Sequence, residues 1–158
     1  MTTVAFDDLA GAAGLDLGHT DWVPIDQSRI DGFATVTEDH QWIHVDPVRA
    51  AEGPFGATIA HGYLTLSYAG ARLAELLDVP ECTQIINYGL DRVRFPAPLK
   101  SGTQMRVHAV ITDVEAVPHG YQVAVRITAE AQHADRPVCV ADAKLRLLRH
   151  PDSGPAYA

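Results

Sequence analysis

An acid and a histidine, Asp39 and His44, stand five positions apart in the segment FATVTEDHQWIHVDPVRA at residues 33–50. A histidine gains and loses its proton near neutral pH, and a nearby carboxylate can orient it or share a water molecule with it. If the two side chains converge from one short connection, they form a pair that can polarise a water. Each also has a structural interpretation. Asp39 could cap a helix or turn, and His44 could be a core histidine bonded to a backbone carbonyl.

A second short stretch, IAHGYLTLS at residues 59–67, opens the most apolar helix that the sequence predicts. The first amides of a helix have no acceptor within it, and the helix dipole favours negative charge at that end. The amide of Gly62 could therefore hold the oxygen of a carbonyl that becomes an enolate, with His61 beside it to position the substrate. The alternative is that Gly62 is needed only for close packing.

A metal site is the less favoured interpretation of the same histidines. His40 and His44 are four positions apart and resemble a metal-binding pair, with Asp39, Asp46 or His61 as further ligands. The pattern around them does not predict one continuous helix, however, and no fixed third-ligand motif accompanies the pair. We therefore predict that the protein holds no metal.

The composition is that of an ordinary globular protein. The chain has 158 residues, of which 47% are hydrophobic and 20% charged, and this predicts one domain at residues 1–150 with a flexible tail at 151–158. The net charge of −8 and the lack of a Lys/Arg run argue against nucleic-acid binding. Cys82 and Cys139 fit no metal or redox spacing and are expected to be buried thiols. With neither a signal peptide nor an apolar run of about 18 residues, we expect a cytoplasmic protein without a membrane span.

Two helices must position the Asp39–His44 segment. Apolar residues recur at helical spacing over 26–38, and Asp26 or Ser28 can cap the start. Asp46, followed directly by proline, predicts that a short helix begins there and ends near residue 53. The tight connection at 39–45 would present polar side chains.

A long helix is predicted at residues 62–78, where the sequence is apolar nearly all round, and such a helix is expected to be buried on every side. Before it, residues 4–17 have helical character and residues 19–25 indicate a short strand.

The remainder of the chain indicates β-strands. Residues 84–95 predict a strand with a bend at Gly89, and a turn follows. Apolar and polar residues then alternate in three long strands, near 105–112, 121–130 and 139–147. A curved antiparallel sheet wrapped around the long helix, in the α+β class, accounts for the whole pattern. Because such a sheet leaves an open edge that a second copy can pair with, we expect a homodimer.

The two polar stretches also resemble a known family. EDHQWIH at residues 38–44 is similar to the Gly-Asp-x-Asn-Pro-x-His motif of the MaoC-like dehydratases, or R-specific enoyl-CoA hydratases. The acid and histidine of the motif fall on Asp39 and His44, and a later His-Gly of the family falls on His61 and Gly62. The resemblance is closest to the branch that contains mycobacterial hydratases and the nodulation protein NodN.

Three positions depart from the family motif. Glu38, Gln41 and Trp42 stand where the motif has Gly, Asn and Pro. Gln41 can still hydrogen-bond a water or orient a neighbour, so we retain it as a candidate positioning residue. A serine that some members carry in the central helix is replaced by Gly70.

The resemblance implies a single hotdog domain that pairs as a dimer and hydrates a trans-2-enoyl thioester reversibly to the (R)-3-hydroxyacyl form. Water held by the acid–histidine pair would add to C3, while the Gly62 amide binds the thioester oxygen. The substrate would be a thioester of coenzyme A or of acyl carrier protein, and no further cofactor is expected. Arg92, Arg94 and Lys100 would lie near the carrier phosphates, although as strand and turn charges they need no special role.

Two other functions stay open at this point. A hotdog thioesterase would also bind acyl-CoA but cleave it, and its acid normally lies on the central helix or comes from the partner. Here that helix offers only Glu75, near its far end. A non-catalytic acyl-binding subunit of a heterodimer is the other alternative, but such subunits usually lose the acid or the histidine.

Overall fold

A computed structural model describes residues 1–149, so the predicted tail at 151–158 lies outside the described residues. The sheet is built from β5 (Gln84–Arg94), β6 (Thr103–Val117), β7 (Gly120–Ala131) and β8 (Cys139–Leu148). The strand order is β2-β6-β7-β8-β5, and all of these neighbours pair antiparallel. The short strands β2 (Asp16–His19) and β3 (Val23–Ile25) both pair with β6.

The long strands confirm the predicted alternation of apolar and polar residues. Along β8, every second residue from Cys139 to Leu147 is buried, and the residues between them are partly exposed. β6 and β7 repeat the pattern from Met105 to Ile111 and from Val123 to Ala131. One face of the sheet therefore forms the core. The predicted bend at Gly89 is present as a register shift between Asn87 and Gly89 in β5.

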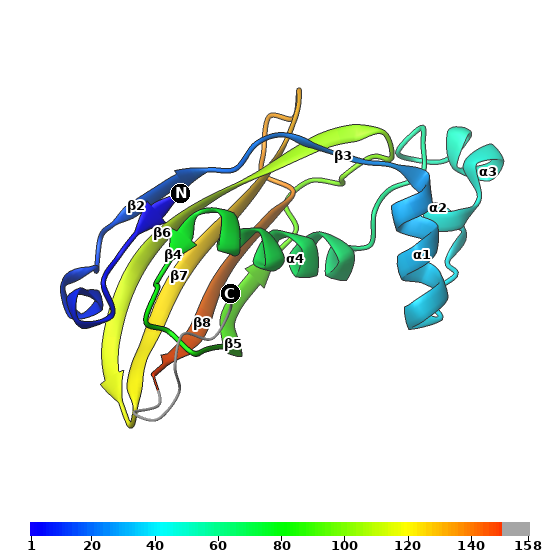
Figure 1. The fold of residues 1–158 in the computed structure, drawn as a ribbon. Helices are drawn as coiled ribbons and strands as arrows, with labels where there is room; N and C mark the ends of the chain where they lie inside the picture. The colour runs from blue at the N-terminus through cyan, green and yellow to red at the C-terminus, as the bar shows by residue number, and fades with distance from the viewer. Residues whose placement is uncertain (150–158) are drawn as a thin grey trace.

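The central helix α4 (Gly62–Ala71) crosses the inner face of the curved sheet and contacts β7 and β8 (Figure 1). The predicted end at residue 78 is wrong. The chain continues as the 3-10 helix η2 (Arg72–Glu75) and then as β4 (Leu77–Asp78). Helix gives way here because Leu77–Asp78 pairs in parallel with β1 (Thr2–Thr3).

Burial of the central helix on every side is also wrong for the single chain. Leu64, Thr65 and Ala69 are buried against the sheet, whereas Tyr63 is 74% exposed. The helix has an apolar composition, but only the face toward the sheet is covered. The outer face is left to solvent or to another molecule.

The helix predicted at residues 4–17 is likewise much shorter. Only a 3-10 helix, η1 (Phe6–Gly11), forms there, and β2 begins at Asp16. Gly14 has a positive φ of 87°, a conformation that ends helical structure and that glycine adopts without strain. The strand predicted at 19–25 is divided between β2 and β3.

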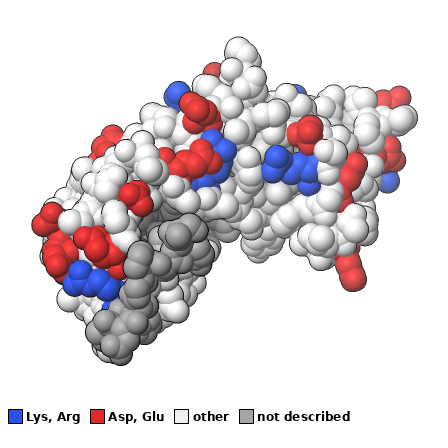
Figure 2. Space-filling view, in the orientation of Figure 1, with Lys and Arg blue, Asp and Glu red and all other residues white. Residues whose placement is uncertain are grey.

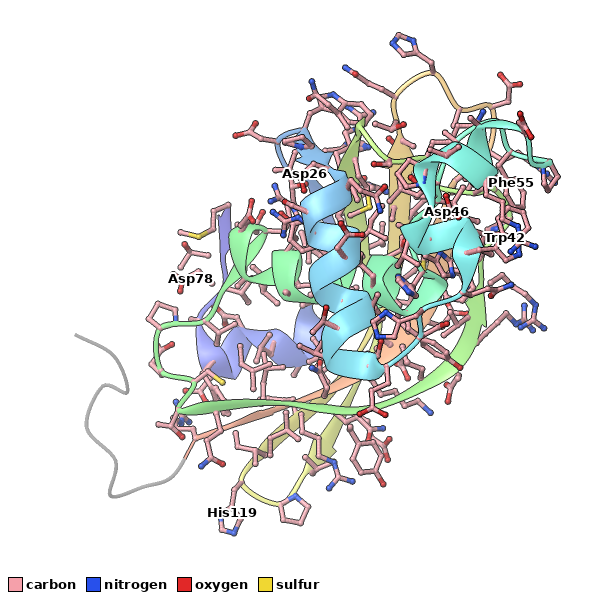
Figure 3. The ribbon with its side chains drawn as sticks, turned by 90° about the vertical axis from the view of Figure 1, so that its right-hand side faces the viewer. Asp26, Trp42, Asp46, Phe55, Asp78 and His119 are labelled. Carbon is pink, nitrogen blue, oxygen red and sulfur yellow. The ribbon has the colours of Figure 1, made fainter. Side chains whose placement is uncertain are left out.

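Three helices gather beyond one end of the sheet (Figure 1). They are α1 (Gln27–Thr37), the one-turn helix α2 (Trp42–Val45) and α3 (Pro47–Ala51). The two predicted N-caps are confirmed, because Asp26 accepts from the amide of Arg29 and Asp46 from that of Arg49, each at 3.0 Å. Figure 3 views the molecule from this end, with Asp26 at the start of α1 and Trp42 and Asp46 flanking α2.

Charge is distributed rather than concentrated. On the face drawn in Figure 2, acidic side chains are spread over both ends of the molecule, and Lys and Arg side chains lie in small groups among them. Among the described residues, no helix is long and apolar enough to cross a membrane.

Candidate active site

The structure brings the predicted acid and both predicted histidines together. Asp39 follows the end of α1, His44 lies in α2, and His61 is the N-cap residue of α4. One ligand-type atom from each of the three side chains lies within 4.8 Å of the others. The connection that was predicted to be irregular contains α2, and this single turn directs His44 inward.

His44 is buried, and a backbone carbonyl fixes its orientation. Its Nδ1 lies 2.7 Å from the carbonyl oxygen of Ile59. Because a carbonyl can only accept a hydrogen bond, Nδ1 carries the proton and Nε2 presents a lone pair. Burial lowers the pKa of His44 below 6.5, and His61 lowers it further, while the Ile59 hydrogen bond and the Asp39 charge oppose the shift. A neutral imidazole with a free Nε2 is a base at neutral pH.

His61 is held in the same way. Its Nε2 donates to the backbone carbonyl of Asp39 at 3.0 Å, so Nδ1 bears the lone pair. This Nδ1 is buried and has no hydrogen-bond partner among the described residues. The ring stacks on His44 with centroids 3.8 Å apart. His61 therefore fixes the backbone at Asp39 and forms one wall of the site.

Asp39 itself is exposed, within 4.8 Å of the two histidines. Its Oδ1 accepts only a long hydrogen bond from the amide of Gln41, at 3.4 Å. Capping is thus a minor role for this carboxylate, which leaves it free to contact a ligand. Gln41 is exposed too, as the N-cap residue of α2, and its carbonyl accepts from the amide of His44 at 2.9 Å.

Two of the residues that differ from the family motif, Glu38 and Trp42, lie at the ends of helices. Glu38 ends α1 in the left-handed conformation, with φ 61°, which is the conformation that glycine favours. Trp42 packs over Gly53, where an added Cβ would lie 3.1 Å from its ring, and the guanidinium of Arg49 lies 4.3 Å from the ring centroid. Trp42 therefore closes the turn after α3.

A cavity of about 320 Å³ opens beside His44 and Gly62. Gly62 is the first residue of α4, so its amide belongs to the turn that has no acceptor inside the helix. The close-packing interpretation of Gly62 is also correct, because an added Cβ would lie 3.0 Å from the ring of Phe95. We refer to this space as the catalytic cavity; its lining includes His44, Phe55, Ile59, Gly62, Thr65 and Phe95.

Gln27, the first residue of α1, was not predicted as part of the site. Its Nε2 donates to the backbone carbonyl of His44 at 2.7 Å, and its Oε1 accepts a short hydrogen bond from Thr58. One side chain thus ties α1 and α2 to the segment before α4. The sequence contains no signal for this contact, since Gln27 shows only the polarity of a helix start.

The three cations predicted near the carrier phosphates lie on two different segments of the structure. Arg92 and Arg94 lie on the exposed strand β5, where the Arg94 guanidinium donates to the carbonyl of Val93 at 2.7 Å. Lys100 lies in the loop between β5 and β6, with its backbone paired to Ile59. Lys100 is thus linked to His44 through Ile59, whose carbonyl accepts from the His44 ring.

The ligand-type atoms of Asp39, His44 and His61 are near enough to raise the question of a metal. The two imidazole rings are inclined by only 26° and stack face to face. The lone pair of an imidazole nitrogen lies in the plane of its ring, so the lone pairs of two stacked rings lie in nearly parallel planes. A tetrahedral metal ion needs ligand lone pairs that converge on one point. This geometry favours acid–base use of the histidines, and the absence of a metal stays a prediction.

The chain is similar to a known domain family and to several known proteins. Residues 8–133 match the family model of the MaoC like domain. The 3-hydroxyacyl-thioester dehydratase Z of Mycobacterium tuberculosis is 46% identical over 142 residues, which cover 89% of this chain and 94% of that protein. Nodulation protein N of Rhizobium leguminosarum bv. viciae is 41% identical over 145 residues, with 90% of each chain covered.

Solved structures show the same fold. An unliganded R-hydratase from Pseudomonas aeruginosa superposes with a TM-score of 0.70 over 92% of this chain and 91% of that one, at 24% identity. The fold is the hotdog, an antiparallel sheet around a central helix, as the sequence predicted. The dehydratase names among the relatives support an enzyme of the hydratase or dehydratase kind. This chain belongs to the MaoC-like dehydratase family.

Proposed function

We propose that the protein is an R-specific enoyl-CoA hydratase, which adds water reversibly to a trans-2-enoyl thioester and forms the (R)-3-hydroxyacyl thioester. The observation that carries this proposal is the arrangement around the catalytic cavity. A buried histidine with a free Nε2 and the first residue of a helix line this cavity, and an exposed carboxylate lies within 4.8 Å of the histidine. The relatives named as an R-hydratase and a hydroxyacyl-thioester dehydratase support the same chemistry and its stereochemistry.

The proposed reaction needs a base, an oxyanion site and a proton donor. As the water oxygen bonds to C3, one of its protons passes to the acid–histidine pair, and the C2=C3 electrons move onto the thioester oxygen. The Gly62 amide stabilises the resulting enolate through a hydrogen bond and the dipole of α4. C2 then takes a proton from the pair. One water is added in total, and the pair returns to its starting charge.

The assay follows from the loss of the conjugated double bond. Purified protein is mixed with crotonyl-CoA, and the ultraviolet absorbance of the enoyl thioester is followed to equilibrium. Chiral chromatography of the product should show the R isomer. Unchanged absorbance, or an S product, would contradict the proposal.

The same sample separates the alternatives. A thioesterase would release free thiol, and a non-catalytic subunit would bind enoyl-CoA without turnover. The structure weakens the thioesterase alternative, because Glu75 lies beyond α4 and its carboxylate is 2.8 Å from the Arg72 guanidinium. A carboxylate held in that ion pair is a poor nucleophile or base.

We place the acyl chain along α4. A second, mainly apolar cavity of about 380 Å³ lies between this helix and the sheet, lined by Leu66, Ser67, Gly70, Leu90, Ile127 and Leu145. Gly70, where some family members carry serine, leaves the helix surface open at this point. Rates with enoyl-CoAs of increasing chain length would define the depth of the cavity, and Gly70→Leu should shorten the longest chain accepted.

We also propose a homodimer that pairs through β5. This strand ends the sheet order, and it exposes several large apolar side chains: Ile85, Ile86, Tyr88 and Leu90. Unpaired edge strands with apolar side chains are covered in stable proteins. Light scattering should give twice the chain mass, and Leu90→Arg should halve it. The control is Val48→Arg on α3, at a residue that is 82% exposed and distant from β5 in the sequence. A monomeric mass for the unaltered protein would disprove the pairing.

A further inference from the structure

A third cavity, with a polar lining, adjoins the catalytic cavity. It has a volume of about 670 Å³ and is formed by the loop between β5 and β6 and the loop between β7 and β8. We refer to it as the loop cavity; its charged or ionisable lining residues are Lys100, His133, Asp135 and Arg136. The proposed reaction assigns no role to this cavity.

The loop cavity is connected to the site through shared residues. Ala97 and Pro98 line both cavities. The backbone of Lys100 pairs with Ile59, whose carbonyl orients His44, and the amide of Ala60 donates to the carbonyl of Leu99 at 2.7 Å. The position of Lys100 is thus fixed relative to the catalytic histidine by a short run of backbone hydrogen bonds.

The cations of the loop cavity are unpaired. Some cations elsewhere on the surface are paired with a carboxylate, as Arg126 is with Asp142 and Lys144 with Asp91. Within residues 1–149, the side chains of Lys100 and Arg136 form neither an ion pair nor a ring contact, even though Asp135 also lines the cavity. In a chain with a net charge of −8, two unpaired cations beside one cavity attract an anion.

We propose that the loop cavity binds the phosphate of the pantetheine arm that carries the acyl group. This inference rests on the proposed function, which places the thioester in the catalytic cavity next door. An arm that leaves the thioester past Ala97 and Pro98 enters the loop cavity directly. Lysine supplies a point charge to a phosphate and arginine a two-pronged donor. Arg92 and Arg94 line neither cavity, so the assignment moves from them to Arg136 together with Lys100.

The test compares three crotonyl thioesters that differ only in the carrier: coenzyme A, 4′-phosphopantetheine and pantetheine. Lys100→Ala and Arg136→Ala should each raise KM for crotonyl-CoA by about threefold to tenfold, the range for a partly exposed charge-assisted contact, with kcat unchanged. KM for the pantetheine thioester, which has no phosphate, should not change. Arg126→Ala is the matched control, because it removes an exposed cation that lines neither cavity.

The 4′-phosphopantetheine substrate identifies which phosphate is bound. If both variants raise its KM, the site binds the phosphate common to coenzyme A and acyl carrier protein. If only crotonyl-CoA is affected, the site binds the nucleotide phosphates instead, and the assignment to the pantetheine phosphate is overturned. Equal effects on all three substrates, or no effect on crotonyl-CoA, would overturn the inference. Calorimetric titration with free coenzyme A gives a readout without turnover, so the site can be tested even if hydration is not observed.

Discussion

Replacing Asp39 with asparagine removes one charge and preserves the shape of the side chain. The carboxylate is exposed, and its hydrogen bond from the Gln41 amide, at 3.4 Å, can be kept by the amide oxygen of asparagine. The carbonyl that orients His61 belongs to the backbone and is unchanged. We therefore expect a change of less than about 0.5 kcal/mol in the free energy of unfolding.

The expected effect on catalysis is far larger. Loss of one acid–base group lowers turnover by about 100-fold to 10,000-fold, or roughly 3 to 5 kcal/mol of barrier. The Asp39 charge also raises the pKa of His44, so its removal should move the acid limb of the rate profile to lower pH. These two effects together distinguish a catalytic carboxylate from a structural one.

The measurement is the hydration of crotonyl-CoA by Asp39→Asn across a pH series, with urea unfolding of the same sample. Glu38→Gln serves as the matched control, because it removes an exposed neighbouring charge outside the histidine cluster. A loss below tenfold in Asp39→Asn, or an equal loss in the control, would refute the assignment of Asp39 as a catalytic group.

Four further outcomes are expected. Because the pKa of His44 is lowered below 6.5 and the base must be neutral, kcat/KM should fall only as the pH drops below 6.5; a midpoint at or above that value would contradict the role of His44. Gly62→Ala should still fold, because the Phe95 ring that the new methyl group meets is 43% exposed and can move. The displaced ring should lower kcat/KM on the order of tenfold or more, and unchanged kinetics would exclude a role for this contact. Glu38→Gly should raise the free energy of unfolding, measured in urea, by about 0.5–1 kcal/mol, because glycine adopts the left-handed φ without strain. A free energy of unfolding below that of the unaltered protein would refute that explanation. Dialysis against EDTA should leave the hydration rate unchanged, and loss of activity restored by a divalent ion would show that a metal is required.

The sequence could predict that Asp39 and His44 come together because the signals around them are local. Asp26 and Asp46 cap their helices as predicted, and these helices bracket the connection that carries Asp39 and His44. The alternation in β6, β7 and β8 is a property of single strands and needs no knowledge of the partners. These elements determine the hotdog core.

Contacts between distant segments could not be predicted in this way. The helix propensity of the sequence favours continuation of α4 past Ala71. Instead, Leu77–Asp78 forms a strand that pairs with the first residues of the chain, and the α-helix ends at Ala71. The hydrogen bonds of Gln27 join residues 17 and 31 positions away, and no periodicity encodes them. For His44, the interpretation as a core histidine bonded to a backbone carbonyl is compatible with a role as a base, because the carbonyl bond at Nδ1 leaves Nε2 free.

Both histidines of the site are oriented by main-chain carbonyls, those of Ile59 and Asp39. Every residue type supplies a carbonyl, so no side-chain replacement at either position can delete the acceptor itself. Orientation of the two rings is thereby protected from point mutation in a way that a carboxylate or amide partner would not allow. The sequence around the two histidines is correspondingly free to vary. Glu38 and Trp42 can therefore replace the usual residues of the motif while both imidazoles keep their tautomers.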